Sequence, residues 1–150
     1  MAAGDSKLAQ EYPLQAGTGA YNNTTDVFRI FFCSDTYAAV DATQTPFNLT
    51  HVTQVGGGNF PIAGVILTSV TWTRAAAVSK LDYANLTTIT KNASNPATIR
   101  TAVIVNDTST LNDIYKVIDL TADGSTPIDV VNNDFDYTVA AGGSVTGTVV

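Results

Sequence analysis

The chain has 150 residues, of which 45% are hydrophobic and only 13% are charged, so we expect one domain whose polar surface is formed largely by Thr, Asn, Ser and Gln. Thirteen acidic residues against seven basic ones give a net charge of −6, and the basic residues are spread singly along the sequence. Nucleic acids and anionic membranes select for a basic face, so we expect neither as a partner.

Residues 1–26 show no helical or alternating period and are interrupted by Pro13, Gly17 and Gly19. We therefore predict an extended N-terminal arm over residues 1–26, followed by a domain over residues 27–150. A disordered tail is the alternative. Four large side chains stand isolated in this segment and are candidates for docking on a neighbouring molecule: Leu8, Tyr12, Leu14 and Tyr21.

From residue 27 onward, short Thr- and Val-rich runs are separated by turn residues. Nearly continuous apolar sequence predicts a buried core strand at residues 27–33, and alternation predicts a half-exposed strand at residues 49–55. The three glycines of residues 56–58 then break the pattern. Further strands are expected at residues 62–67, 70–73, 78–83, 86–90, 99–105, 115–120, 127–131, 134–139 and 145–150.

Many short strands separated by turns predict an all-β protein, an antiparallel β-sandwich of the jelly-roll-like or immunoglobulin-like kind. The last run, residues 145–150, is the second segment that we expect to make contacts, through strand addition to a neighbour. Its candidate interaction residues are Val145, Val149 and Val150.

The chain offers few groups for catalysis, with one His, one Cys and one Glu. Cys33 lies in an apolar run, where a small buried residue is expected. His51 lies in a predicted strand. The chain has no Gly-x-Ser-x-Gly elbow that would place a nucleophilic Ser for such a His. Glu11 lies in the predicted arm. The glycines of residues 56–58 lead into Asn-Phe-Pro, with no helix start or Lys to hold a phosphate. We therefore predict no enzyme, no catalytic residue and no cofactor.

Acidic residues gather within eighteen positions of the C-terminal half: Asp119, Asp123, Asp129, Asp134 and Asp136. Asp and Asn oxygens in loops are typical calcium ligands, but the spacing lacks the terminal Glu of an EF-hand loop. Solvated turn residues are the favoured interpretation, so we predict no metal site. A structural calcium site is the alternative.

Short motifs follow one another over most of the chain, covering roughly residues 27–140. They are an apolar strand ending in Ser-Asp (28–36), Val-Gly-Gly-Gly-Asn-Phe-x-x-Ala-Gly-Val (55–65), Val-Thr-Trp-Thr (70–73), Asp-Tyr with Leu-Thr-Thr-Ile-Thr (82–90), Arg-x-Ala-Val-Ile-Val-Asn (100–106), Val-Ile-Asp-Leu-Thr (117–121) and Asp-Phe-Asp-Tyr-Thr-Val (134–139). In this order they resemble small β-rich virion proteins of tailed bacteriophages, of the capsid decoration, or cement, type.

The resemblance implies a structural role without catalytic residues. Proteins of this kind sit on the capsid as homotrimers, bind the major capsid protein and staple neighbouring capsomers. We therefore expect a location on the capsid surface of a virion. The first residues lack the pattern of a secretion signal, and no apolar run approaches the roughly 18 residues of a membrane span, so synthesis in the host cytoplasm is expected.

Two other functions remain as alternatives. One is a phage tail or head–tail connector protein. The other is a carbohydrate-binding module, which would need aromatic side chains exposed together for stacking on sugars. The candidates for such a platform are Trp72, Tyr83, Tyr115 and Tyr137, although packing in the core is the favoured interpretation of these residues.

Overall fold

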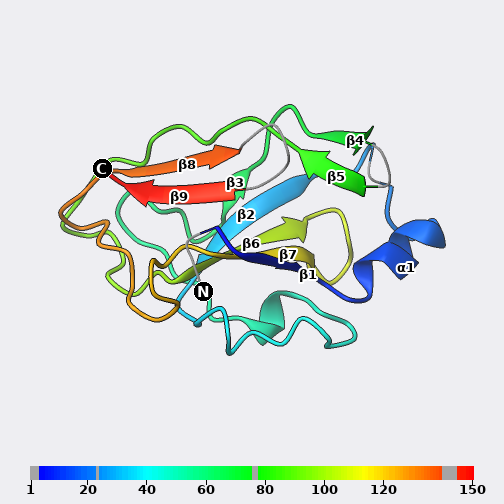
Figure 1. Cartoon of the computed structure of the whole chain (residues 1–150), viewed down its shortest axis with the longest axis horizontal. Coiled ribbons are helices and arrows are strands. Elements are labelled where there is room, and N and C mark those ends of the chain that lie inside the picture. The colour runs from blue at the N-terminus through cyan, green and yellow to red at the C-terminus, as the bar shows by residue number, and fades with distance from the viewer. Residues whose placement is uncertain (1–3, 23, 76–77, 140–144) are drawn as a thin grey trace.

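The computed structural model describes residues 4–22, 24–75, 78–139 and 145–150. It has the all-β fold that the sequence predicts, with antiparallel sheets and little helix (Figure 1). The elements in chain order are β1 (Ser6–Leu8), α1 (Tyr12–Gly17), β2 (Phe28–Cys33), the 3-10 helix η1 (Leu49–His51), β3 (Val65–Ile66), β4 (Thr71–Ala75), β5 (Val78–Asp82), β6 (Thr101–Asn106), β7 (Asp113–Asp119), β8 (Phe135–Val139) and β9 (Val145–Val149).

The main sheet has five strands in the order β1-β7-β6-β2-β3, and all neighbours in it are antiparallel. Its three inner strands lie in the core: every residue of β6 is buried, and β2 and β7 have one half-buried residue each. Strands covered on both faces read as continuous apolar runs, because neither set of alternate side chains meets water. This explains why β2, β6 and β7 were readable from the sequence.

Two separate hairpins, β4–β5 and β8–β9, pack on the main sheet (Figure 1). Phe135 of β8 meets Phe32 of β2 with ring centroids 5.8 Å apart, and Trp72 of β4 meets Tyr115 of β7 at 5.6 Å. Hydrogen bonds among the described residues do not join the hairpins into one second sheet. The all-β class is therefore confirmed, whereas the jelly-roll-like or immunoglobulin-like sandwich stays a prediction.

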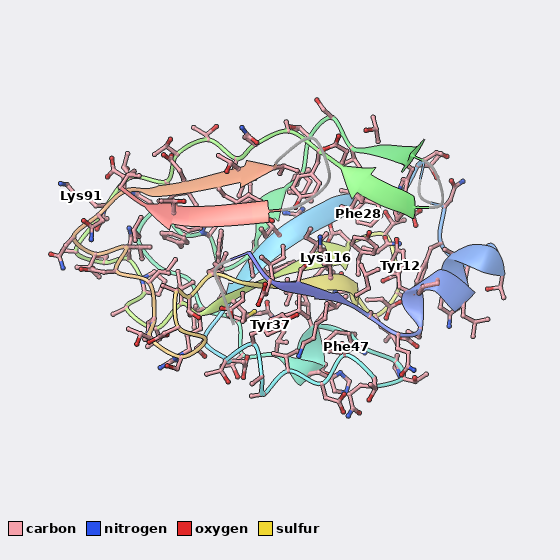
Figure 2. All side chains as sticks on the ribbon, viewed as in Figure 1. Tyr12, Phe28, Tyr37, Phe47, Lys91 and Lys116 are labelled. Atoms are coloured by element: carbon pink, nitrogen blue, oxygen red, sulfur yellow. The ribbon has the colours of Figure 1, made fainter. Side chains whose placement is uncertain are left out.

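The expectation of an extended arm is wrong for the part of residues 1–26 that the structure describes. β1 pairs with β7 and becomes an edge strand of the main sheet, with Leu8 opposite Lys116. α1 follows, and Pro13 lies in its first turn, where a missing N–H is tolerated. Figure 2 shows Tyr12 pointing from α1 toward the sheet. The segment folds back because β7 offers an unpaired edge and the core accepts its aromatic rings.

Four strand predictions are also wrong or too long. Residues 49–55 form no strand: the first three form η1, because the Asn48 Oδ1 caps the turn by accepting from Thr50 N at 3.0 Å, and of the rest only Gln54 makes a β-bridge, to Cys33. Within residues 86–90 only Ile89 makes a β-bridge, to Phe135, and residues 127–131 form no strand. The expected strand at 62–67 shrinks to the two residues of β3. Asn, Asp and Thr side chains in these segments offer the backbone local hydrogen bonds that compete with a ladder.

Asn95 is a buried polar residue that ties three loops together. Its Oδ1 accepts from Asn59 N at 2.8 Å, and its Nδ2 donates to Val130 O at 2.8 Å and to Thr90 O at 3.1 Å. The glycine-rich turn packs directly on it: Gly58 has a φ of 55°, and a Cβ there would lie 2.5 Å from the Asn95 Oδ1. Gly58 therefore has a packing role beside a buried amide.

Candidate functional site

The first candidate surface lies where β1 leads into α1, and we call it the N-terminal surface. Leu8 is 51% exposed and Leu14 is 67% exposed, both large values for leucine side chains. An open hollow of about 670 Å³ lies beside them, lined by residues 7–10, Pro13, Ala38 and residues 40–43. Two of the four predicted interaction residues of this segment are thus free to contact another molecule.

Lys7 holds one side of this hollow in place through its side-chain contacts. Its Nζ donates to the carbonyl oxygens of Tyr37, at 2.7 Å, and of Val40, and it lies 4.6 Å from the centre of the Tyr37 ring. Burial lowers the pKa of the Lys7 ammonium, and the nearby Asp41 carboxylate opposes that effect. The lysine thus joins β1 to the loop at residues 37–41 and gives the N-terminal surface a defined shape.

Tyr12 and Tyr21, the other two predicted interaction residues of this segment, are buried in the core of their own chain. The Tyr12 ring lies 4.9 Å from Tyr21 and 4.7 Å from Tyr115, and the Tyr21 hydroxyl donates to Asp113 Oδ2 at 2.5 Å. Burial, with the Asp113 hydrogen bond as the next cause, raises the pKa of Tyr21 far above its usual range. The prediction that these tyrosines dock on a neighbour is therefore wrong. They anchor the N-terminal segment to the core of the same chain.

The second candidate surface is the C-terminal strand β9. Val149 is 38% exposed and Val150 is 63% exposed, whereas the side chain of Val145 lies outside the described residues. A hollow of about 300 Å³ adjoins Val149 and is lined by Ala122, Asp123 and residues 126–129. β9 pairs with β8 along one edge only among the described residues.

Two of the five aspartates that suggested calcium, Asp123 and Asp129, accept hydrogen bonds within their own turns. Asp123 accepts from Ser125 N, Thr126 N and Thr126 Oγ1, and these hydrogen bonds, that of the Thr126 hydroxyl first, hold the pKa of its carboxyl far below the usual range. Asp129 makes a similar turn with Asn132, whose side chain is the first cause of its lowered pKa. In the described ranges, no three His, Cys, Asp or Glu side chains gather as metal ligands.

Cys33 and His51 lie in different environments, the thiol buried in β2 and the imidazole exposed in η1. Cys33 is fully buried, as predicted, and burial raises the pKa of its thiol to about 12, with a smaller contribution from Asp35. A thiol with that pKa is protonated at neutral pH and is a poor nucleophile. The exposed His51 lies in η1, where its Nδ1 accepts from Asn48 N at 3.4 Å and closes a capping box.

The aromatic residues considered for sugar binding lie in the core. Tyr83, Tyr115 and Tyr137 are buried, and the hydroxyls of Tyr83 and Tyr137 lie 2.8 Å apart. Trp72 is half-buried and packs edge-on against Tyr115. The favoured interpretation of these residues as core packing is thereby confirmed, and they form no exposed stacking platform.

Comparisons with family models, with curated proteins and with solved structures found no match to this chain. Within the part of the chain that the structure describes, no helix has the length and apolar content that crossing a bilayer requires. The arrangement of the residues themselves therefore has to support any functional proposal, and its two prominent features are the N-terminal surface and β9.

Proposed function

We propose that this protein is a bacteriophage capsid decoration, or cement, protein. It binds the outer surface formed by the major capsid protein and stabilises the shell by bridging neighbouring capsomers. The observation that carries the proposal is the pair of exposed apolar sites at the two ends of the chain, Leu8 with Leu14 and Val149 with Val150. These side chains lie on a surface with few charges, which suits contact with other protein.

A cement role matches the small size of these sites. Burying one exposed leucine contributes at most about 1.5–3 kcal/mol, and Leu8 and Leu14 are partly buried already. A single N-terminal surface thus gives a weak contact. On a shell, however, linked copies engage several capsid subunits at once, and the second contact forms at a high effective concentration. Weak individual contacts then give stable occupancy of the whole capsid.

The resemblance of the short motifs in residues 27–140 to capsid decoration proteins supports the same proposal and makes it more specific. It implies a homotrimer, a position on the capsid surface of the virion and synthesis in the host cytoplasm. It also implies a structural role without chemistry, which agrees with the turn roles of the aspartates and the buried thiol of Cys33.

Capsid binding tests the proposal through the N-terminal surface. The double variant Leu8→Glu, Leu14→Glu leaves the backbone unchanged and replaces two exposed apolar side chains with two negative charges. Co-sedimentation with capsids of the encoding phage, prepared without the protein, should show at least a tenfold loss of binding, about 1.4 kcal/mol. Circular dichroism should be unchanged, because both side chains are solvent-exposed.

Ile62→Glu is the matched control. Ile62 is 60% exposed but lies in the loop before β3, outside the N-terminal surface. This variant should bind capsids as the wild type does. Equal binding by the wild type and the double variant would refute the proposed contact, and failure of the wild type to bind any capsid would refute the cement function itself.

A further inference from the structure

A second open hollow lies beside α1, on a different side of the helix from the N-terminal surface, and we call it the Asp113 hollow. Its volume is about 350 Å³, and it is lined by Gln15, residues 20–21, Pro46, residues 108–111 and Asp113. Pro13 lines the hollow of the N-terminal surface, and successive residues of a helix point about 100° apart. The exposed Leu14, which lies between Pro13 and Gln15, therefore separates the two hollows.

Asp113 lines this hollow, is 8% exposed, and has one carboxylate oxygen without a donor. Its Oδ2 accepts from the Tyr21 hydroxyl at 2.5 Å, and its backbone N–H donates to Ser109 Oγ at 2.7 Å, so two other lining residues hold it in place. Its Oδ1 is buried and accepts no hydrogen bond from the described residues. A buried carboxylate oxygen without a donor costs free energy, and such an atom indicates a missing partner.

The negative charge of the Asp113 hollow has no cation beside it, because the described residues that line the hollow include no Lys, Arg or His. This charge acts on Tyr21: burial first, and then the carboxylates of Asp113 and Glu11, raise the pKa of the Tyr21 hydroxyl. Asp107, in the same connection between β6 and β7, differs in this respect, because Arg29 Nε lies 2.8 Å from its Oδ2. The Asp113 hollow therefore lacks the cationic partner that Asp107 has.

The other lining residues match an arginine side chain. Ser109 and Thr110 carry hydroxyl groups, and Leu111, which is 52% exposed, offers apolar surface. Arginine packs its methylene stem on apolar surface while its guanidinium donates through five N–H groups, and the guanidinium is less strongly hydrated than the ammonium of lysine. A metal ion fits less well, because no three His, Cys, Asp or Glu side chains gather as ligands in the part of the chain that the structure describes.

We propose that the Asp113 hollow binds the guanidinium group of an arginine side chain from a partner protein, with an N–H of that group donating to Asp113 Oδ1. Because Oδ1 is covered in the free chain, binding includes a rotation of the carboxylate toward the hollow, while Oδ2 keeps the Tyr21 hydroxyl. A protein partner that packs on the exposed Leu14 and Leu111 brings its own side chains to the opening. The site does not depend on the cement function, since it follows from the hollow and its charge.

Titration of the isotope-labelled full chain with N-acetylarginine amide, followed by NMR, tests the site. N-acetylcitrulline amide is the matched ligand, because it has the same length and shape but no charge. At equal ionic strength the arginine compound should bind at least tenfold more tightly, about 1.4 kcal/mol, and should shift the amide resonances of Leu111 and Asp113. Equal affinities, no saturable binding of the arginine compound, or shifts confined to residues outside the hollow would overturn the proposal.

Asp113→Asn removes the charge and keeps an oxygen that can accept from the Tyr21 hydroxyl, so it should lose the preference for arginine over citrulline. Asp107→Asn is the matched control, because it changes the net charge equally but lies outside the hollow, and it should keep the preference. Loss of the preference in both variants would indicate general attraction to an acidic chain and would contradict the site. If Asp113→Asn does not fold, the two ligands compared on the wild type still decide. Capsids are not needed, so failure here leaves the cement function standing, and the reverse also holds.

Discussion

Asn95→Ala is the substitution whose effect on folding can be worked out most fully from the structure. It removes three side-chain hydrogen bonds, to Asn59 N, Thr90 O and Val130 O. Each such bond contributes about 1 kcal/mol net, and the side chain of Asn95 is buried. Because Val130 is fully buried, its carbonyl keeps no access to water after the change. We expect the free energy of unfolding to fall by about 3 kcal/mol.

The assay is urea unfolding followed by circular dichroism, with thermal unfolding as a second readout. For a chain of 150 residues, a loss of about 3 kcal/mol lowers Tm by roughly 6–12 °C. Asn92→Ala is the matched control. Asn92 lies in the same turn but is exposed, and its Oδ1 makes one hydrogen bond, from Ser94 N at 2.8 Å. That variant should lose less than about 1 kcal/mol.

A difference between the two variants of less than about 0.5 kcal/mol, the usual scatter of surface substitutions, would contradict a stabilising role for the Asn95 amide. It would mean that the amide of Asn95 does not tie the glycine-rich turn to the loops at Thr90 and Val130. Asn95→Asp separates loss of hydrogen bonds from loss of volume. It keeps the acceptor for Asn59 N but sets a carboxylate oxygen against two carbonyls, so we expect a loss of stability at least as large as that of Asn95→Ala.

Three more predictions concern buried groups. Tyr21→Phe leaves Asp113 with neither carboxylate oxygen hydrogen-bonded among the described residues. Urea unfolding should therefore show that the free energy of unfolding falls by about 2 kcal/mol. An unchanged midpoint would contradict the stabilising role of the Tyr21–Asp113 hydrogen bond. Gly147→Ala places a Cβ 2.8 Å from Leu120 Cδ2. This overpacking should lower the free energy of unfolding by about 1–3 kcal/mol. A more stable variant would contradict the packing of β9 on the core. Finally, burial raises the pKa of Cys33 from 9.0 to about 12, so above pH 9 the native state keeps a proton that the unfolded state loses. The contribution of this thiol to stability should therefore be constant below pH 9 and decline as the pH rises toward 12, and a rise of Tm between pH 9 and 12 would contradict the burial.

The strands that the sequence predicted well are those covered on both faces. Residues 27–33 and 99–105 are long apolar runs and became β2 and β6, and burial of Cys33 followed from the same signal. β1 could not be found in this way. Its three residues have no pattern of their own, and it forms only because it pairs with β7, which is more than a hundred residues later in the chain.

The candidate site was predicted in part for a similar reason. The isolated large side chains at the N-terminus predicted docking on a neighbouring molecule, but composition cannot tell an anchor to the same chain from an anchor to a neighbour. Tyr12 and Tyr21 turned inward because partners for their rings and one hydroxyl lie in the core. Leu8 and Leu14 remained exposed.

The most direct measurement of the central claim is an electron-microscopy map of the virion whose genome encodes this chain. We expect density for the protein on the outside of the capsid lattice, with the N-terminal surface of Leu8 and Leu14 against the major capsid protein. Density confined to the tail or to the head–tail connector, or a capsid surface on which the protein is missing, would contradict it.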